Sequence, residues 1–124
     1  SNLDWFPTIL AMAGIELDPD ILIRGRNMVP QLLGKERDWD QSYYAEYSTK
    51  HQSQTHMRMF SDGKWKLIRD FNNTGRDELY YLVNDSAESN NLISLETKRI
   101  RTIRARLERE LLSRMEAIGD NVHQ

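Results

Sequence analysis

Cysteine is absent from this sequence of 124 residues. Its absence excludes disulfide bonds, thiolate metal sites and a cysteine nucleophile within these residues. Long hydrophobic runs are also missing, since no apolar stretch approaches the roughly 18 residues that a membrane-spanning helix needs. Neither charge is in large excess, because 17 basic against 19 acidic residues give a formal net charge of −2. Such a balance lacks the basic excess of a nucleic-acid or membrane-binding surface, so we expect neither partner.

The usual short motifs of catalysis and metal binding are missing as well. The sequence contains no phosphate-binding loop, no GxSxG and no GxGxxG. His51, His56 and His123 do not form a zinc-type pair, and the aspartates lack the spacing of a calcium loop. We therefore expect no catalytic residue and no metal ligand in this chain.

The composition is that of one small globular domain. Hydrophobic residues make up 39% and charged residues 29% of the chain, which is too apolar for a disordered segment. The sequence does not begin with methionine and starts in the middle of a helical pattern. We therefore expect it to be a piece of a longer protein.

Alternating and aromatic runs predict a β-sheet in the middle of the sequence. The runs Met57–Ser61 and Lys64–Phe71 flank Asp62-Gly63, which predicts a hairpin with a type I′ turn. A turn-rich loop, Asn72–Asp77, then leads to a third run, Leu79–Val83.

An additional strand is expected before this hairpin. Tyr43–Tyr47 alternates and is aromatic, which predicts a strand. The stretch that follows, Thr49–Thr55, is polar throughout, and we predict a loop there.

The C-terminal third of the sequence predicts a long amphipathic helix. Ser94 is the expected N-cap, Glu96 would complement the helix dipole in the first turn, and Gly119 would end the helix. Alternating Glu and Arg on the other faces are typical of a solvated surface. The apolar stripe recurs every three or four residues: Ile100, Ile103, Leu107, Leu111, Met115 and Ile118.

These elements predict an α+β fold, a small antiparallel sheet of about four strands packed against the long C-terminal α-helix. A short helix, Leu3–Gly14, and a connector, Ile15–Asp38, precede the sheet. Asp4 is the expected cap of the short helix. Its apolar face, with Phe6 and Ile9, requires a partner, because a helix this short is marginal alone. Met28–Leu33 is expected to form one or two helical turns.

Two N-terminal stretches resemble motifs of the formylglycine-dependent sulfatases, in the alkaline phosphatase superfamily. Asp4–Gly14 is similar to that family's D-x-x-P-T-[IL]-L-x-[LM]-A-G. Gly25–Lys35 is similar to its G-x-S-L-x-P-L-L-x-G-K, with departures at Asn27 and Gln31.

Two further stretches extend the resemblance over nearly the whole chain. Arg58 followed by Lys64–Ile68 is similar to the family's R-x-x followed by K-[WY]-K-L-I. Glu78–Leu92 is similar to E-L-Y-D-L-x-x-D-P-x-E-x-x-N-L, with departures at Tyr81 and Ser86. Four motifs of moderate specificity in the family's order identify the chain as similar to the sulfatase C-terminal region.

The resemblance implies a division of labour between two domains. Sulfatases have an N-terminal catalytic domain, in which a formylglycine made from a C/S-x-P-S-R motif attacks sulfate esters beside a calcium or magnesium ion. This sequence lacks that motif, so both cofactors are expected outside it. Residues 41–124 would be the C-terminal subdomain and residues 1–40 a connecting segment from the catalytic domain. The expected partners are that catalytic domain and a sulfated small molecule or saccharide. The family also implies a periplasmic, secreted or lysosomal location.

The resemblance also implies a place for substrate contacts, since loops of this subdomain border the active-site cleft. The predicted loop Thr49–Thr55 is the best candidate, and Lys50, His51 and His56 would bind an anionic sugar or its sulfate. A solvated connector without a role is the alternative for this loop. For the whole chain two alternatives stay open: a free-standing interaction or carbohydrate-binding module, and the C-terminal part of a related phosphate or phosphonate ester hydrolase.

Overall fold

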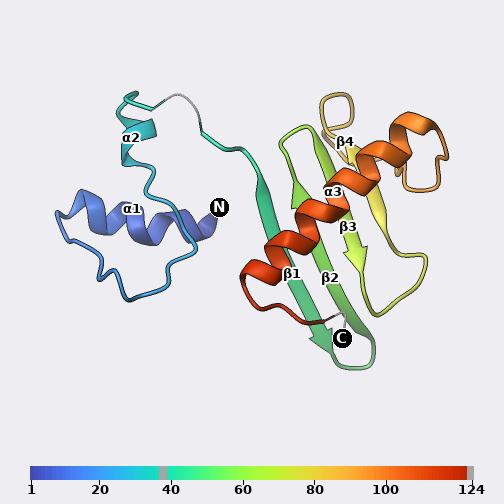
Figure 1. Ribbon diagram of the computed structural model, residues 1–124, viewed down its shortest axis with the longest axis horizontal. Helices are drawn as coiled ribbons and strands as arrows, with labels where there is room; N and C mark the ends of the chain where they lie inside the picture. The colour runs from blue at the N-terminus through green and yellow to red at the C-terminus, as the bar shows by residue number, and fades with distance from the viewer. Residues whose placement is uncertain (37–38, 123–124) are drawn as a thin grey trace. The chain divides into compact units, whose positions relative to one another are not determined.

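The computed structural model describes residues 1–36 and 39–122, so Arg37 and Asp38 of the predicted connector lie outside the described residues. The chain divides into two compact units, Ser1–Asp40 and Gln41–Gln124. The second unit holds a sheet and a helix, which crosses one face of the sheet (Figure 1). Its five elements are β1 (Tyr43–Lys50), β2 (Gln54–Ser61), β3 (Trp65–Asp70), β4 (Glu78–Tyr81) and α3 (Lys98–Ala117).

The four strands form an antiparallel meander in the order β1-β2-β3-β4. Each strand pairs with its neighbour in sequence, as short connections favour. The predicted α+β fold, a four-stranded antiparallel sheet with a long C-terminal helix, is therefore confirmed.

The core lies between α3 and one face of the sheet. Leu67 of β3 pairs with Leu79 of β4, and both side chains are fully buried. Alternate residues of a strand point to the same face, so Leu67 and Trp65 face the helix together. The apolar stripe of α3 covers them, as predicted. The buried core consists of Phe60, Trp65, Leu67, Leu79, Ile100, Leu107, Leu111 and Met115.

The helix α3 begins three residues later than predicted. Thr97 is the N-cap, and its Oγ1 accepts a hydrogen bond from the backbone N–H of Ile100 at 3.3 Å. The predictions of Ser94 as the cap and of Glu96 in the first turn are wrong. The reason is tertiary: the N–H of Leu92 donates to the carbonyl of Leu79 at 2.8 Å, which keeps the preceding chain beside β4.

The hairpin predicted at Asp62-Gly63 forms between β2 and β3, but its turn is not type I′. Only Gly63 of the pair has a positive φ, +83°, whereas type I′ requires two such residues. The Asp62 carboxylate shapes the turn instead, because it accepts hydrogen bonds from the backbone N–H of Lys64 at 2.9 Å and of Trp65 at 2.7 Å.

The described residues of the first unit form three short helices, η1 (Asn2–Asp4), α1 (Trp5–Met12) and α2 (Val29–Leu32). Both predicted helical regions are thus confirmed. Asp4 stands at the N-cap of α1 but makes no side-chain cap. Its buried carboxylate accepts from the backbone N–H of Arg26 at 2.8 Å and so joins α1 to the connector.

The connector can pack closely against the backbone of Leu3 because residue 25 is a glycine. A Cβ added to Gly25 would lie 1.9 Å from the carbonyl oxygen of Leu3, so a larger residue cannot stand there without moving the backbone.

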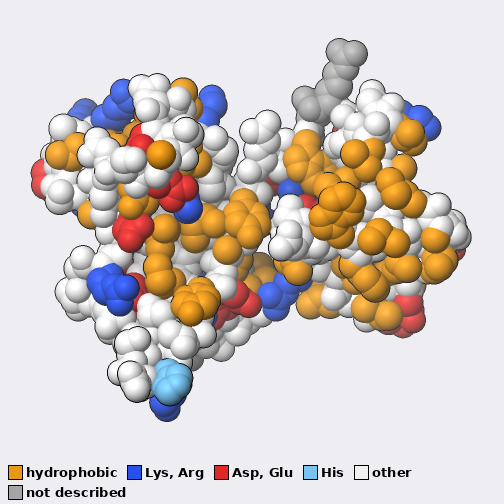
Figure 2. Space-filling model, turned by 180° about the vertical axis from the view of Figure 1, so that it is seen from behind, with side chains coloured by type: hydrophobic (Ala, Val, Ile, Leu, Met, Phe, Trp, Pro, Cys, Tyr) orange, Lys and Arg blue, Asp and Glu red, His pale blue; other side chains and the backbone are white. Residues whose placement is uncertain are grey.

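The apolar side of α1 is exposed. Phe6 and Ile9 are each 57% exposed, and hydrophobic side chains gather over this unit in Figure 2. Within the described residues, no helix is both long and apolar enough to cross a membrane.

Candidate functional site

The predicted substrate loop is mostly strand. Lys50 ends β1 and pairs with Gln54 of β2, and Thr49 pairs with Thr55. The connection is a tight turn of residues 51–53, with the N–H of His51 donating to the carbonyl of Ser53 at 3.0 Å. The prediction of a loop over Thr49–Thr55 is wrong at both ends. Polar residues can continue these strands because the ladder is formed by backbone N–H and C=O groups, which every one of these residues carries.

The three candidate residues lie near this turn but differ in their surroundings. Lys50 and His51 are exposed, and no ion pair to either is found within residues 1–36 and 39–122. His56 lies in β2, is partly buried, and its Nδ1 is 3.1 Å from Oγ of Ser48. The structure thus brings Lys50 and His51 together on the surface and holds His56 further back against β1.

A buried ion pair lies behind His56 on the same face of the sheet. Arg58 of β2 donates from Nε and Nη2 to the carboxylate of Asp120, with the Nη2 contact at 2.9 Å, and from Nη1 to Ser48 Oγ at 3.0 Å. The Tyr44 hydroxyl donates to the same carboxylate at 2.8 Å. The Arg58 hydrogen bonds lower the pKa of Asp120, against the opposing effect of burial. Arg58 therefore ties the residues after α3 to the sheet, which is a structural role.

A second buried carboxylate, Asp70, joins the two loops at the end of the sheet that carries His51. It accepts hydrogen bonds from Thr55 Oγ1 at 2.6 Å, from Asn73 Nδ2 at 2.7 Å, and from the backbone N–H groups of His56 at 3.2 Å and Asn72 at 3.1 Å. Burial opposes its charge, but these four donors outweigh burial and lower the pKa of Asp70.

Side chains of Asn72 and Asn73 extend this connection. Each donates from Nδ2 to the carbonyl of Gln54, at 3.1 Å and 2.9 Å. The β3–β4 loop, residues 71–77, is thus bonded to the first residue of β2. Figure 1 shows this loop at the same end of the sheet as the β1–β2 turn.

The residues of the Glu78–Leu92 motif have structural roles. The Asp85 carboxylate accepts from the backbone N–H groups of Ser89 and Asn90, both at 2.9 Å. Glu88 binds Lys66 Nζ at 2.7 Å, and Asn91 Oδ1 accepts from the N–H of Leu79 at 3.0 Å. These contacts fold the segment after β4 back onto the sheet.

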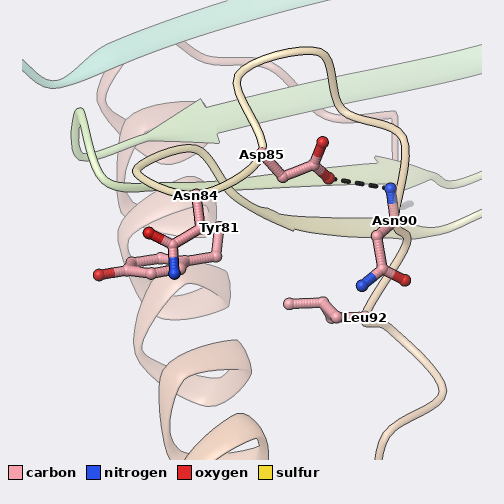
Figure 3. A pocket seen from close by; sticks show the side chains of 5 residues that line it. All are labelled: Tyr81, Asn84, Asp85, Asn90 and Leu92. Atoms are coloured by element: carbon pink, nitrogen blue, oxygen red, sulfur yellow. Dashed lines mark hydrogen bonds between the residues drawn. The ribbon is translucent and has the colours of Figure 1, made fainter.

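A surface depression of about 380 Å³ lies over the same segment. Tyr81, Asn84, Asp85, Asn90 and Leu92 line it, and Figure 3 shows the Asp85 carboxylate turned toward the Asn90 N–H rather than offered to a ligand. The depression is therefore a feature of the turn and a weaker candidate than the end of the sheet.

Residues 1–36 and 39–122 do not offer a fit for the cofactors that the resemblance implies. No group of three His, Cys, Asp or Glu side chains in the described parts of the chain could hold a metal ion. The sequence also contains no C/S-x-P-S-R motif as a source of formylglycine.

Sequence reasoning missed Asp70 and Asp120. Both lie far in sequence from the residues they bind, 15 positions for Asp70 and Thr55 and 62 positions for Asp120 and Arg58. Local pattern marks them only as an aspartate at a strand end and an aspartate after a helix, so no signal in a single sequence identifies their partners.

The sequence is similar to one protein family and to two named sulfatases. A family model described as N-sulphoglucosamine sulphohydrolase, C-terminal, matches residues 1–117. N-acetylglucosamine-6-O-sulfatase of Bacteroides thetaiotaomicron is 31% identical over 97 residues, which cover 73% of this chain and 17% of that protein. Steryl-sulfatase of Rattus norvegicus is 36% identical over 69 residues, which cover 55% of this chain and 12% of that protein.

Solved structures share the fold. A protein in complex with its substrate, D-glucosamine-2-N,6-O-disulfate, is similar with a TM-score of 0.79 and 26% identity, over 97% of this chain and 24% of that chain. A 2-O GAG sulfatase is similar with a TM-score of 0.80 and 22% identity, over 95% of this chain and 25% of that chain, which shows the fold alone. This chain thus spans about a quarter of these solved chains and less than a fifth of the curated relatives.

Proposed function

Because this chain belongs to the sulfatase family as a C-terminal region of the N-sulphoglucosamine sulphohydrolase type, we propose that it is the C-terminal part of an enzyme that hydrolyses sulfate esters of carbohydrates. The family match over residues 1–117 carries the proposal. A sugar is supported by one relative named N-acetylglucosamine-6-O-sulfatase and another solved with D-glucosamine-2-N,6-O-disulfate. Since a steryl-sulfatase also matches, the choice of a sugar depends on these two relatives.

The catalytic chemistry belongs to a preceding domain in this proposal. Formylglycine and a calcium or magnesium ion would lie there, and no residue of this chain is assigned as nucleophile or metal ligand. Residues 41–124 form the C-terminal subdomain and residues 1–40 the segment that connects it to the catalytic domain.

The exposed apolar side chains of the first unit support the catalytic domain as a partner. Trp5, Phe6 and Met12 are 54%, 57% and 61% exposed. Burying apolar surface stabilises a protein or complex by roughly 25 cal/mol for each Å² removed from water. A cluster of exposed apolar side chains therefore favours a domain that covers it.

The end of the sheet that carries the β1–β2 turn is the proposed substrate-binding surface. Lys50 and His51 offer N–H donors to a sulfate or another acidic group of the sugar, and both are exposed. His56 can contribute through Nε2, because its Nδ1 faces Ser48. A turn between two paired strands holds such groups on a rigid support.

The test compares two substrates in the full-length enzyme. Lys50→Ala and His51→Ala should each lower kcat/KM for a sulfated saccharide by about three- to tenfold, the effect of losing a hydrogen bond worth about 1 kcal/mol. A small aryl sulfate should be hydrolysed at the wild-type rate, because it does not extend to the turn.

Lys64 provides the matched control. It is also an exposed lysine in a hairpin turn, but it lies in the β2–β3 turn at the other end of the sheet. Lys64→Ala should leave both substrates unaffected. Equal kinetics for wild type, Lys50→Ala and His51→Ala on the saccharide would remove this surface from the proposal.

A further inference from the structure

The β3–β4 loop carries a cation that the sequence did not single out. Arg76 is 59% exposed at its side chain, and its Nη1 lies 3.9 Å from Oδ2 of Asp70. That carboxylate is already occupied by four hydrogen-bond donors and has no exposed side-chain surface. A contact of 3.9 Å to a fully bonded carboxylate leaves most of the five N–H donors of the guanidinium available to a ligand.

The acidic neighbours of Arg76 are also engaged. The Asp77 carboxylate pairs with Nε of Arg69 at 2.6 Å, and Oε2 of Glu78 accepts the Tyr80 hydroxyl at 3.0 Å. The two acidic residues that follow Arg76 in sequence are therefore already bonded, whereas Arg76 itself is held, within the described residues, only by its long contact to Asp70.

Asp70 fixes the loop that carries Arg76 to the strand that follows the β1–β2 turn. It binds Thr55 and His56 on β2 together with Asn72 and Asn73 on the loop. Because the two connections share one buried carboxylate, their backbones are held together at this end of the sheet. A rigid arrangement of this kind lowers the entropic cost of binding a ligand at both places.

From these contacts we propose that Arg76 binds a second acidic group of the saccharide, one that is not hydrolysed, and that Asp70 is the residue that positions it. The inference rests on the proposed function, since Lys50 and His51 form the other half of the same surface. A guanidinium suits this role, because it can bind a sulfate or carboxylate through two parallel N–H groups.

The test uses the full-length enzyme and glucosamine bearing either one or two sulfate groups. Arg76→Ala should raise KM for the disulfated sugar by about three- to tenfold, with kcat and the KM for the monosulfated sugar unchanged. Arg76→Lys, which keeps the charge but loses the two-point contact, should fall between wild type and Arg76→Ala.

Arg101 is the matched control. Its side chain is 58% exposed and its Nη1 lies 4.0 Å from Glu96, so its exposure and its long ion pair resemble those of Arg76. It lies in the first turn of α3. Arg101→Ala should bind and turn over both sugars as wild type does. The assignment of Arg76 would be overturned if Arg76→Ala had the same KM for the disulfated sugar as Arg101→Ala. It would also be overturned if Arg76→Ala raised KM equally for the monosulfated and the disulfated sugar.

Asp70→Asn tests the positioning role separately. The amide keeps the size of the carboxylate but accepts fewer hydrogen bonds, so amide hydrogen exchange at His56 and Asn72 should accelerate while KM for the disulfated sugar rises. Should this variant fail to fold, Thr55→Val removes one of the four donors and should give the same two changes, more weakly. Unchanged exchange and KM in the variant that folds would exclude the role of Asp70.

Failure of the proposed function would look different. A wild-type enzyme that binds the disulfated sugar in calorimetry without hydrolysing any sulfate ester would overturn the proposed function. The ratio of dissociation constants for Arg76→Ala and Arg101→Ala would still decide whether Arg76 binds the acidic group.

Discussion

At the scale of single residues, the strongest constraints come from buried charges. Arg58 is 4% exposed and bonds to Asp120, Ser48 and the carbonyl of Met57. Removing one partner of a buried ion pair is strongly destabilising, because the remaining charge is then buried without a counter-ion that compensates for its loss of hydration. The sequence showed Arg58 as a motif residue but gave no sign of Asp120.

The Arg58–Asp120 pair yields a prediction for stability and its pH dependence. Asp120→Ala should lower the free energy of unfolding by about 3–5 kcal/mol at pH 7, because Arg58 is then buried without a counter-ion. The folded-state pKa of Asp120 lies below its usual value. Its contribution is therefore complete above the unfolded-state pKa of about 4 and is lost as the pH falls through the folded-state value. Urea unfolding between pH 7 and pH 3 measures both effects.

A double variant is the control for this prediction. Arg58→Met with Asp120→Leu removes both charges and should recover much of the lost stability, as apolar replacements of buried pairs often do. A cost below about 1 kcal/mol for Asp120→Ala, within the range of an exposed pair, would mean that the pair is not formed in solution.

At the scale of elements, the periodicity of apolar residues predicted which helices and strands exist better than it predicted where each one begins and ends. The stripe on α3 and the hairpin runs were visible because each repeats over many residues. The cap at Thr97 and the length of β1 were not visible, since backbone pairing with β4 and β2 decided them. The same holds for the candidate site: residue type singled out Lys50 and His51 as candidates, but the pattern could not distinguish a polar loop from the polar strand ends that the structure shows.

The packing of α3 can be tested with one buried leucine. Leu107 is fully buried against the sheet, so Leu107→Ala should lower the free energy of unfolding by about 2–5 kcal/mol through lost apolar contact and a residual cavity. Leu112, 38% exposed on the same helix, is the matched control. Leu112→Ala should lower the free energy of unfolding by well under half as much as Leu107→Ala does. A loss below half a kcal/mol for Leu107→Ala, with unchanged cooperativity in urea, would mean that α3 packs elsewhere.

At the scale of the whole molecule, the residues that carry the family resemblance build the scaffold. Gly25 permits a close backbone contact, Arg58 holds the residues after α3, and Asp85 and Asn91 fold the segment after β4. A motif of this kind identifies the family without revealing the substrate. The exposed end of the sheet, which the motifs do not include, is where substrate differences between members are expected.

The final prediction concerns activity of the chain by itself. The purified 124-residue protein should release no sulfate from an aryl sulfate above the uncatalysed rate, with or without added calcium or magnesium. The physical reason is that its described residues contain no group of metal ligands and the sequence has no candidate nucleophile within a C/S-x-P-S-R motif. The full-length enzyme, assayed in parallel, is the positive control. Turnover by the isolated chain that disappears on changing a residue within it would contradict this assignment, because the catalytic groups would then have to lie among these residues.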